Sequence, residues 1–104
     1  MKRLAFKMKL NVAQKKAYVE RHNQLWPELE SLLKESGVSE YSIFLDEETH
    51  ILFAFQKVTG KGGSQDLAHS KIVQKWWAYM SEIMETNTDN SPIAKTLVEV
   101  FFME

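Results

Sequence analysis

The 104-residue sequence contains no cysteine, only two prolines and only four glycines. The absence of cysteine excludes disulfides, thiolate metal sites and thiol nucleophiles, and it fits a reducing compartment. No run of about 18 consecutive apolar residues occurs, so the sequence predicts no membrane-spanning helix. At the amino terminus, Lys7 and Lys9 interrupt the apolar core that a signal peptide would need. We therefore expect a cytoplasmic protein without membrane contact.

An excess of basic charge is also missing. The chain has 13 basic and 14 acidic residues, too balanced to hold a phosphate backbone, so we expect no nucleic-acid partner. The histidines His22, His50 and His69 lack metal-site spacing and have no cysteine partner. The glycine-rich segment Gly60 to Gly63 lacks the Walker spacing and reads as a flexible turn. We expect no metal and no cofactor.

The apolar pattern predicts one domain over residues 1–104. The sequence favours a strand at 3–10, then a helix that begins at the N-cap Asn11, ends near Gly37 and is kinked or divided at Pro27. The remaining predicted elements are strands at 41–46 and 51–58, a helix at 66–84 and a strand at 97–103. This β-α-β-β-α-β order predicts a ferredoxin-like α+β fold, with four antiparallel strands and the helices on one face.

The last two predicted strands are unusually apolar. The segment 97–103 ("LVEVFFM") is apolar on both faces, and "ILFAF" at 51–55 is nearly so. A sheet covered by helices on one side only should be polar on the other side. We therefore expect the second face to be covered by another copy of the chain, in a homodimer formed through the sheet faces.

A polar stripe begins the first predicted helix. Tyr18, His22 and Trp26 lie one turn apart on the edge that continues with leucines. One interpretation is a core tyrosine and a core histidine whose polar atoms are satisfied. The other is a catalytic site, because an imidazole with a pKa near ~6.5 can give and take a proton at neutral pH. Aromatic neighbours would then form a platform for the apolar face of a sugar ring.

Three further aromatic residues allow two interpretations each. Trp76 and Trp77 diverge by about 100° on a helix, so we expect one to pack inward and the other to lie at the helix edge, covered by a dimer contact or by a ligand. Tyr41 should face inward with Ile43, as a core tyrosine or as a site residue whose hydroxyl needs a partner.

The segment 89–91 ("DNS") is more typical of a turn than of a ligand site.

Several motifs occur together along the chain. They are "YVERHNQLWPELE", "YSIFLD", "KWWAYM" and "DNSP", in this order and spacing. The combination of R-H-N-x-x-W-P-E-L with a tryptophan doublet some fifty residues later resembles the L-rhamnose mutarotase family over essentially the whole chain. The segment 60–67 ("GKGGSQDL") differs from the family, in which many members are acidic here and carry a further tryptophan that enters the second helix. This difference bears on the rim of the site and on the choice of sugar.

The resemblance implies a dimeric ferredoxin-like α+β barrel that interconverts the α and β anomers of L-rhamnose. It places His22 at the position of the family's proton donor, and it places Tyr18, Tyr41, Trp76 and Trp77 at the sugar-contacting positions. Anomer exchange requires one proton delivered to the ring oxygen and one removed from the anomeric hydroxyl, so acid–base chemistry suffices without a cofactor. The second proton carrier is left open between a tyrosine hydroxyl and a water.

Two other functions remain open from the sequence. Dimeric α+β barrels also include small oxygenases and haem-binding enzymes that use a histidine and aromatic residues, so the fold alone does not decide. The second alternative is a non-catalytic sugar-binding or assembly module with an inert pocket.

Overall fold

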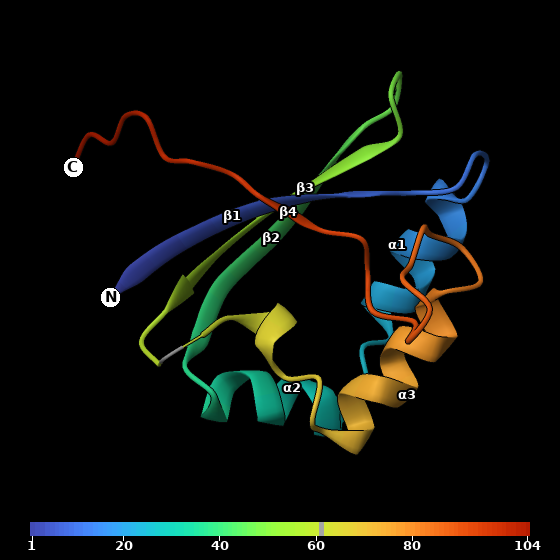
Figure 1. Ribbon diagram of the computed structural model, residues 1–104, viewed down its shortest axis with the longest axis horizontal. Helices are drawn as coiled ribbons and strands as arrows, with labels where there is room; N and C mark the ends of the chain where they lie inside the picture. Colours follow the sequence, from blue (N-terminus) through green and yellow to red (C-terminus); the bar gives the residue numbers. More distant parts are fainter. Residues whose placement is uncertain (61) are drawn as a thin grey trace.

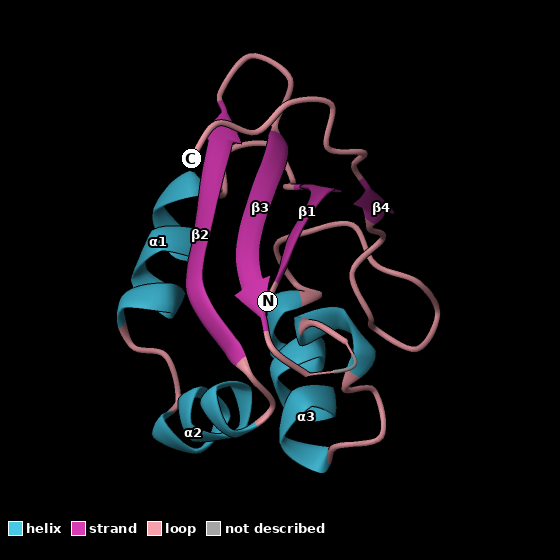
Figure 2. Ribbon diagram, turned by 90° about the vertical axis from the view of Figure 1, so that its left-hand side faces the viewer, coloured by secondary structure: helices cyan, strands magenta, loops and turns pink. Residues whose placement is uncertain are grey.

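The computed structural model describes residues 1–60 and 62–104. Its elements are β1 (Lys2–Lys9), α1 (Lys15–Asn23), α2 (Pro27–Glu35), β2 (Val38–Asp46), β3 (Ile51–Val58), the 3₁₀ helix η1 (Ser64–Asp66), α3 (Lys71–Met80) and β4 (Lys95–Thr96). The strands form one antiparallel sheet in the order β2-β3-β1-β4. Helices α1, α2 and α3 lie on one side of it (Figures 1 and 2). The predicted ferredoxin-like α+β topology is confirmed.

The core lies between the sheet and the helices. Alternation along β1 buries Phe6 and Met8 toward the helices, as expected for a strand with one covered face. From β3 the buried side chains are Leu52, Ala54, Gln56 and Val58, so the inward series of this strand includes one polar residue. In the described part of the chain, no helix has the length and apolarity needed to cross a membrane.

Pro27 divides the first predicted helix in two, as the sequence indicated. Trp26 adopts an extended conformation before it, and Pro27 occupies the first turn of α2, where its missing N–H is not needed. The predicted N-cap Asn11 is wrong, because Ala13 has a positive φ of 65° and α1 begins only at Lys15. The turn at 12–13 therefore delays the helix.

Three other predicted elements have different bounds in the structure. The strand predicted at 41–46 is β2, which begins at Val38. The helix predicted at 66–84 is α3, which begins at Lys71, because residues 64–66 form η1 and Asp66 accepts a hydrogen bond from the Gly63 N–H, and which ends at Met80. The strand predicted at 97–103 is largely absent. Only Lys95–Thr96 and the N–H of Leu97 pair with β1, and the chain then leaves the sheet (Figure 1, red).

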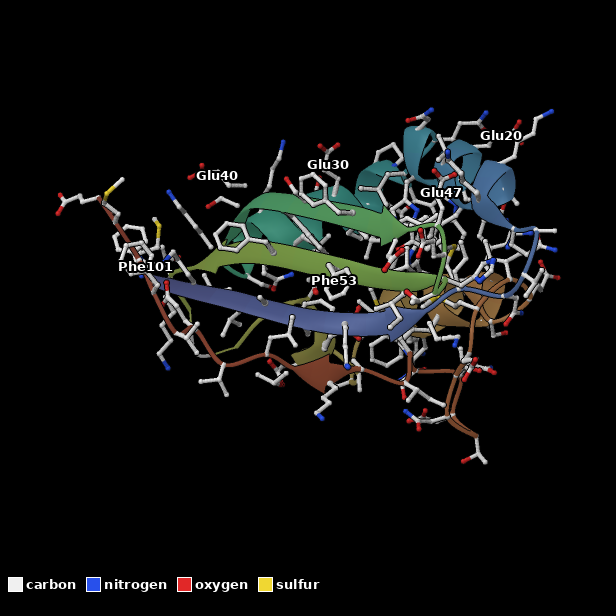
Figure 3. The ribbon with its side chains drawn as sticks, turned by 90° about the horizontal axis from the view of Figure 1, so that it is seen from above. Glu20, Glu30, Glu40, Glu47, Phe53 and Phe101 are labelled. Carbon is white, nitrogen blue, oxygen red and sulfur yellow. The ribbon has the colours of Figure 1, made fainter. Side chains whose placement is uncertain are left out.

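Apolar side chains remain exposed on the sheet face opposite the helices and on the C-terminal segment. Phe44 and Phe53 lie opposite each other across β2 and β3 and are 68% and 39% exposed. In the C-terminal segment Val100 is 92% exposed and Phe101 is 77% exposed. Figure 3 looks onto this face, with the helices behind the sheet and Phe53 over the central strand. Within the described residues, the chain covers only one face of its sheet.

Candidate functional site

The predicted site residues come together around one cavity of about 600 Å³ between the sheet and the helices. Tyr18 and His22 reach it from α1, Tyr41 from β2, and Trp76 and Trp77 from α3. These three elements are separated in sequence, so the fold is what gathers the residues. The cavity has the size of a small-molecule site.

His22 is held in one orientation by its own helix. Its Nδ1 lies 3.0 Å from the Tyr18 carbonyl oxygen, and its ring stacks on the Tyr18 ring at a centroid distance of 4.2 Å. Because a carbonyl only accepts, Nδ1 must carry the proton, so Nε2 of the neutral ring has a lone pair. Among the described residues Nε2 has no protein partner and no buried polar side-chain atom lacks one, so Nε2 is accessible, on a side chain that lines the cavity.

The protonation states of the site groups follow from burial. Burial lowers the pKa of His22, and the hydrogen bond to the Tyr18 carbonyl opposes this only in part. The imidazole is therefore neutral at neutral pH and takes a proton before it gives one. Burial also raises the pKa of Tyr18, which the nearby Tyr41 phenol raises further, and burial raises the pKa of Tyr41. Both phenols thus stay protonated and act as hydrogen-bond donors.

A bulge in β2 aims Tyr41 into the cavity. Two residues, Glu40 and Tyr41, lie opposite the single residue Gln56 of β3. Glu40 has a φ of 47°, a left-handed conformation, and its carboxylate pairs with Lys57 at 2.8 Å. In a regular strand Val38 and Tyr41 would face opposite sides, because an odd spacing separates them. The extra residue lets both face the helices.

Both tryptophans of the doublet are buried, which corrects the expectation that one would lie at the helix edge. Trp76 and Trp77 are 8% and 6% exposed. Trp76 contacts the His22 ring edge-on at 5.4 Å, and it is covered by Trp26 at 5.1 Å and Tyr79 at 5.9 Å. Aromatic residues of the same chain therefore supply the cover that the sequence assigned to a dimer contact or a ligand.

Two residues beside the cavity were missed from the sequence. Gln56 is 0% exposed, and its amide makes two hydrogen bonds with Ser64, which in turn donates to the Tyr41 hydroxyl at 3.3 Å. The sequence did carry a signal, because alternate residues of a strand face the same side. Gln56 is the one polar residue among the alternate positions of β3 that face the helices. A polar residue at a core position is more informative than an apolar one.

The remaining candidates do not form part of the cavity. Ser91 donates from its backbone N–H and its hydroxyl to the Asp89 carboxylate, and Asn90 has a φ of 70°, so 89–91 is the predicted turn. Of the Gly60 to Gly63 segment, Lys61 lies outside the described residues. Across residues 1–60 and 62–104 there is no group of three or more side chains able to hold a metal ion.

The arrangement can exchange protons with a small polar ligand. It combines an accessible imidazole nitrogen, two protonated phenols and a wall of tryptophan. Indole rings pack well on the C–H faces of a sugar, while hydroxyl and imidazole groups match its oxygens. The geometry therefore favours a polyhydroxylated ring as ligand and proton transfer as chemistry.

The comparisons with known proteins point to one family. A family model described as L-rhamnose mutarotase matches residues 3–103. Curated L-rhamnose mutarotases from Formosa agariphila and Bacteroides thetaiotaomicron are 69% and 59% identical over 104 residues, with 100% of each chain covered. A crystal structure of an L-rhamnose mutarotase from Formosa agariphila superposes with a TM-score of 0.93 at 64% identity, over 100% of both chains. A conserved Methanosarcina mazei protein, at 17% identity and a TM-score of 0.60, shares the fold alone. On these grounds the chain belongs to the L-rhamnose mutarotase family.

Proposed function

We propose that this chain is a cytoplasmic isomerase, acting as one domain over residues 1–104, that interconverts the α and β anomers of L-rhamnose. The observation that carries the proposal is the state of His22, whose Nδ1 proton is engaged by Tyr18 while Nε2 is accessible, on a side chain that lines the cavity. Family membership favours this activity over an oxygenase or haem enzyme. Tyr18, Tyr41, Trp76 and Trp77 are proposed to hold the sugar.

The proposed reaction needs two proton transfers. Neutral Nε2 of His22 takes the proton of the anomeric hydroxyl while the bond from C1 to the ring oxygen breaks, and the ring oxygen gains a proton from a phenol or a water. This gives the open-chain aldehyde. After rotation about the C1–C2 bond, the former ring oxygen attacks the other face of the aldehyde and returns its proton. His22 then donates its proton to the new anomeric oxygen, as the donor role implies.

Exchange NMR tests the activity directly. We expect magnetisation transfer between the two anomeric protons of L-rhamnose to accelerate in proportion to protein concentration, because the enzyme opens and closes the ring. Binding alone shifts the signals without faster exchange, so sugar binding without acceleration would identify a non-catalytic module. A Soret band that appears with haemin and depends on His22 would instead indicate the haem-binding alternative.

We further propose a homodimer through the sheet faces. The support is the exposed pair Phe44 and Phe53 on the face without helices, together with the exposed apolar side chains of the C-terminal segment. Single chains seldom leave so many large apolar groups in water unless another surface covers them. A second copy of the same sheet provides a matching apolar surface by two-fold symmetry.

Replacing Val100 with lysine is expected to weaken this dimer. Val100 is 92% exposed in the isolated chain, so the change should not disturb the fold of one chain but would bury a charge in the dimer. We expect light scattering of the parent to give about twice the 12.1 kDa chain mass, and the variant to shift toward one chain mass. Val12→Lys, in the exposed turn that follows β1, is the control. A parent that is monomeric at micromolar concentration would contradict the proposal.

The tryptophan wall should report the sugar. Adding L-rhamnose is expected to change the intrinsic fluorescence, because Trp76 and Trp77 line the cavity. If one of them stacks on the sugar, its replacement by leucine should weaken binding by roughly 0.5–1.5 kcal/mol, measured on folded protein. Trp26→Phe is the control, since Trp26 lies outside the cavity lining. Unchanged affinity in both leucine variants would assign the doublet to packing alone.

A further inference from the structure

A buried polar chain connects β3 to the Tyr41 hydroxyl. The Gln56 amide donates from Nε2 to the Ser64 hydroxyl at 2.9 Å and accepts from the Ser64 backbone N–H at 2.8 Å. The backbone N–H can only donate, so it identifies Oε1 of Gln56 and leaves no ambiguity about which way the amide points. The Gln56 side chain is thus locked onto Ser64.

The Ser64 hydroxyl has only one direction left for its proton. A serine hydroxyl has one proton and two lone pairs. Its oxygen accepts from Gln56 Nε2 at 2.9 Å and from Gln65 Nε2 at 3.3 Å, so both lone pairs are engaged. The proton of Ser64 therefore goes to the Tyr41 hydroxyl oxygen, 3.3 Å away.

We infer that Gln56 and Ser64 are positioning residues that keep the proton of the Tyr41 hydroxyl directed into the cavity, as a donor to an oxygen atom of the sugar. A phenol that accepts from Ser64 points its own proton away from Ser64, toward the ligand. The inference rests on the proposed function for the identity of the ligand. It adds the two residues that fix the direction of the Tyr41 hydroxyl proton. The target oxygen must accept a hydrogen bond, as a ring oxygen or a hydroxyl oxygen does.

The surroundings of Gln56 support a dedicated arrangement. Gln56 lies directly opposite the bulge that carries Tyr41, so the same local irregularity of the sheet sets both residues. A Cβ at Gly63 would overlap Gln56 Oε1 and would come within 2.9 Å of a Leu4 methyl. The amide therefore occupies space that only a glycine at position 63 leaves open. A fully buried amide without such partners would be strongly destabilising.

Ser64→Ala tests the inference through the equilibrium affinity for L-rhamnose, measured by calorimetry. We expect about a three- to tenfold weaker affinity, the usual effect of losing one neutral hydrogen bond, because the Tyr41 proton is no longer directed. Ser64→Thr keeps the hydroxyl and should restore the affinity to within about twofold. Ser31→Ala, at an exposed position of α2, is the matched control and should have no effect.

A double-mutant cycle with Tyr41→Phe separates positioning from a structural role. If Ser64 acts through Tyr41, Ser64→Ala should not weaken sugar binding further once the Tyr41 hydroxyl is gone, although the melting temperature still falls. Gly63→Ala, which displaces the Gln56 amide without removing any hydrogen-bonding side chain, should show the same dependence on Tyr41. Its effect provides a second measurement if Ser64→Ala fails to fold.

Two results would overturn the inference. One is a loss of affinity on Ser64→Ala that is equally large with and without the Tyr41 hydroxyl, since Ser64 would then contact the sugar itself or act through the fold. The other is an unchanged affinity for Ser64→Ala when Tyr41→Phe weakens binding. A parent protein that binds L-rhamnose without accelerating exchange would contradict the proposed activity but leave this comparison intact. A parent that does not bind L-rhamnose would overturn both.

Discussion

His22→Asn is expected to slow anomer exchange by about 10²- to 10⁴-fold, the usual contribution of a positioned acid–base group. Asparagine keeps a polar side chain near the Tyr18 carbonyl, but it cannot accept the anomeric proton at neutral pH. The measurement is exchange NMR on L-rhamnose, with circular dichroism to establish that the variant is folded. We expect dichroism and oligomeric state to match the parent.

Tyr18→Phe is a milder change at the same site, and its exchange rate is compared with that of His22→Asn. It keeps the ring that stacks on His22 and the carbonyl that binds Nδ1, and it removes only the phenol hydroxyl. The rate should therefore fall by less than in His22→Asn. A folded His22→Asn protein that exchanges anomers at the parent rate would assign His22 to the core and leave the reaction without its proton carrier.

The same histidine should set the pH dependence. Burial lowers its pKa below the ordinary value of 6.5, and the neutral form is the one that takes the anomeric proton. The rate per enzyme should therefore be constant around neutral pH and should fall as the pH decreases through this lowered pKa. A rate that instead rises toward acid pH, after subtraction of the uncatalysed exchange, would mean that the imidazolium is the resting reactive form.

Trp77→Ala is expected to destabilise the protein by about 3–5 kcal/mol, the range for truncating a buried tryptophan. Trp77 is 6% exposed and belongs to the core cluster between the sheet and the helices, so its removal leaves a large void. Urea unfolding, at one fixed protein concentration because a dimer would make stability depend on it, measures the change. Loss of sugar binding in this variant alone would therefore not identify a sugar contact.

Val12→Ala provides the matched surface variant, since Val12 is 73% exposed. Its effect should stay within about 0.5 kcal/mol. If Trp77→Ala changed the free energy of unfolding by as little as Val12→Ala, Trp77 would not be a core residue.

The strands with one covered face were predictable because burial imposes a period of two. The place of β1, predicted at 3–10 and found at Lys2–Lys9, and the break at Pro27 are local effects of alternation and of the proline ring, so they can be read from neighbouring residues. The C-terminal strand could not be predicted in this way. Apolar residues on both faces of this segment indicate that another protein surface buries them. The alternation does not say whether that surface belongs to the same chain or to a second copy. In the structure these residues are exposed.

The site was predictable where its residues share one helix. Tyr18 and His22 interrupt an apolar stripe, and that interruption was visible because the spacing of a helix is regular. The contact between Ser64 and Tyr41 was not visible, since 23 positions separate them and η1 was expected to be part of a loop or helix start. Likewise, the burial of Trp76 depends on contacts with Trp26 at the N-cap of α2 and with Tyr79 in α3, which the spacing within one helix does not reveal.

The bulge at Glu40 and Tyr41 makes the chain length of β2 part of the site. A regular ladder with β3 at the present chain length would turn either Val38 or Tyr41 away from the helices, because three positions separate them. Deleting one residue between the two would instead leave them two positions apart, so the ladder would become regular and both side chains would still face the helices. The hairpin tip at 47–50 carries no such restriction, because none of its residues lines the cavity. Among variants of this chain, length changes should therefore be tolerated at the hairpin tip, whereas between Val38 and Tyr41 the change that keeps both side chains on the helix side is a one-residue deletion that removes the bulge.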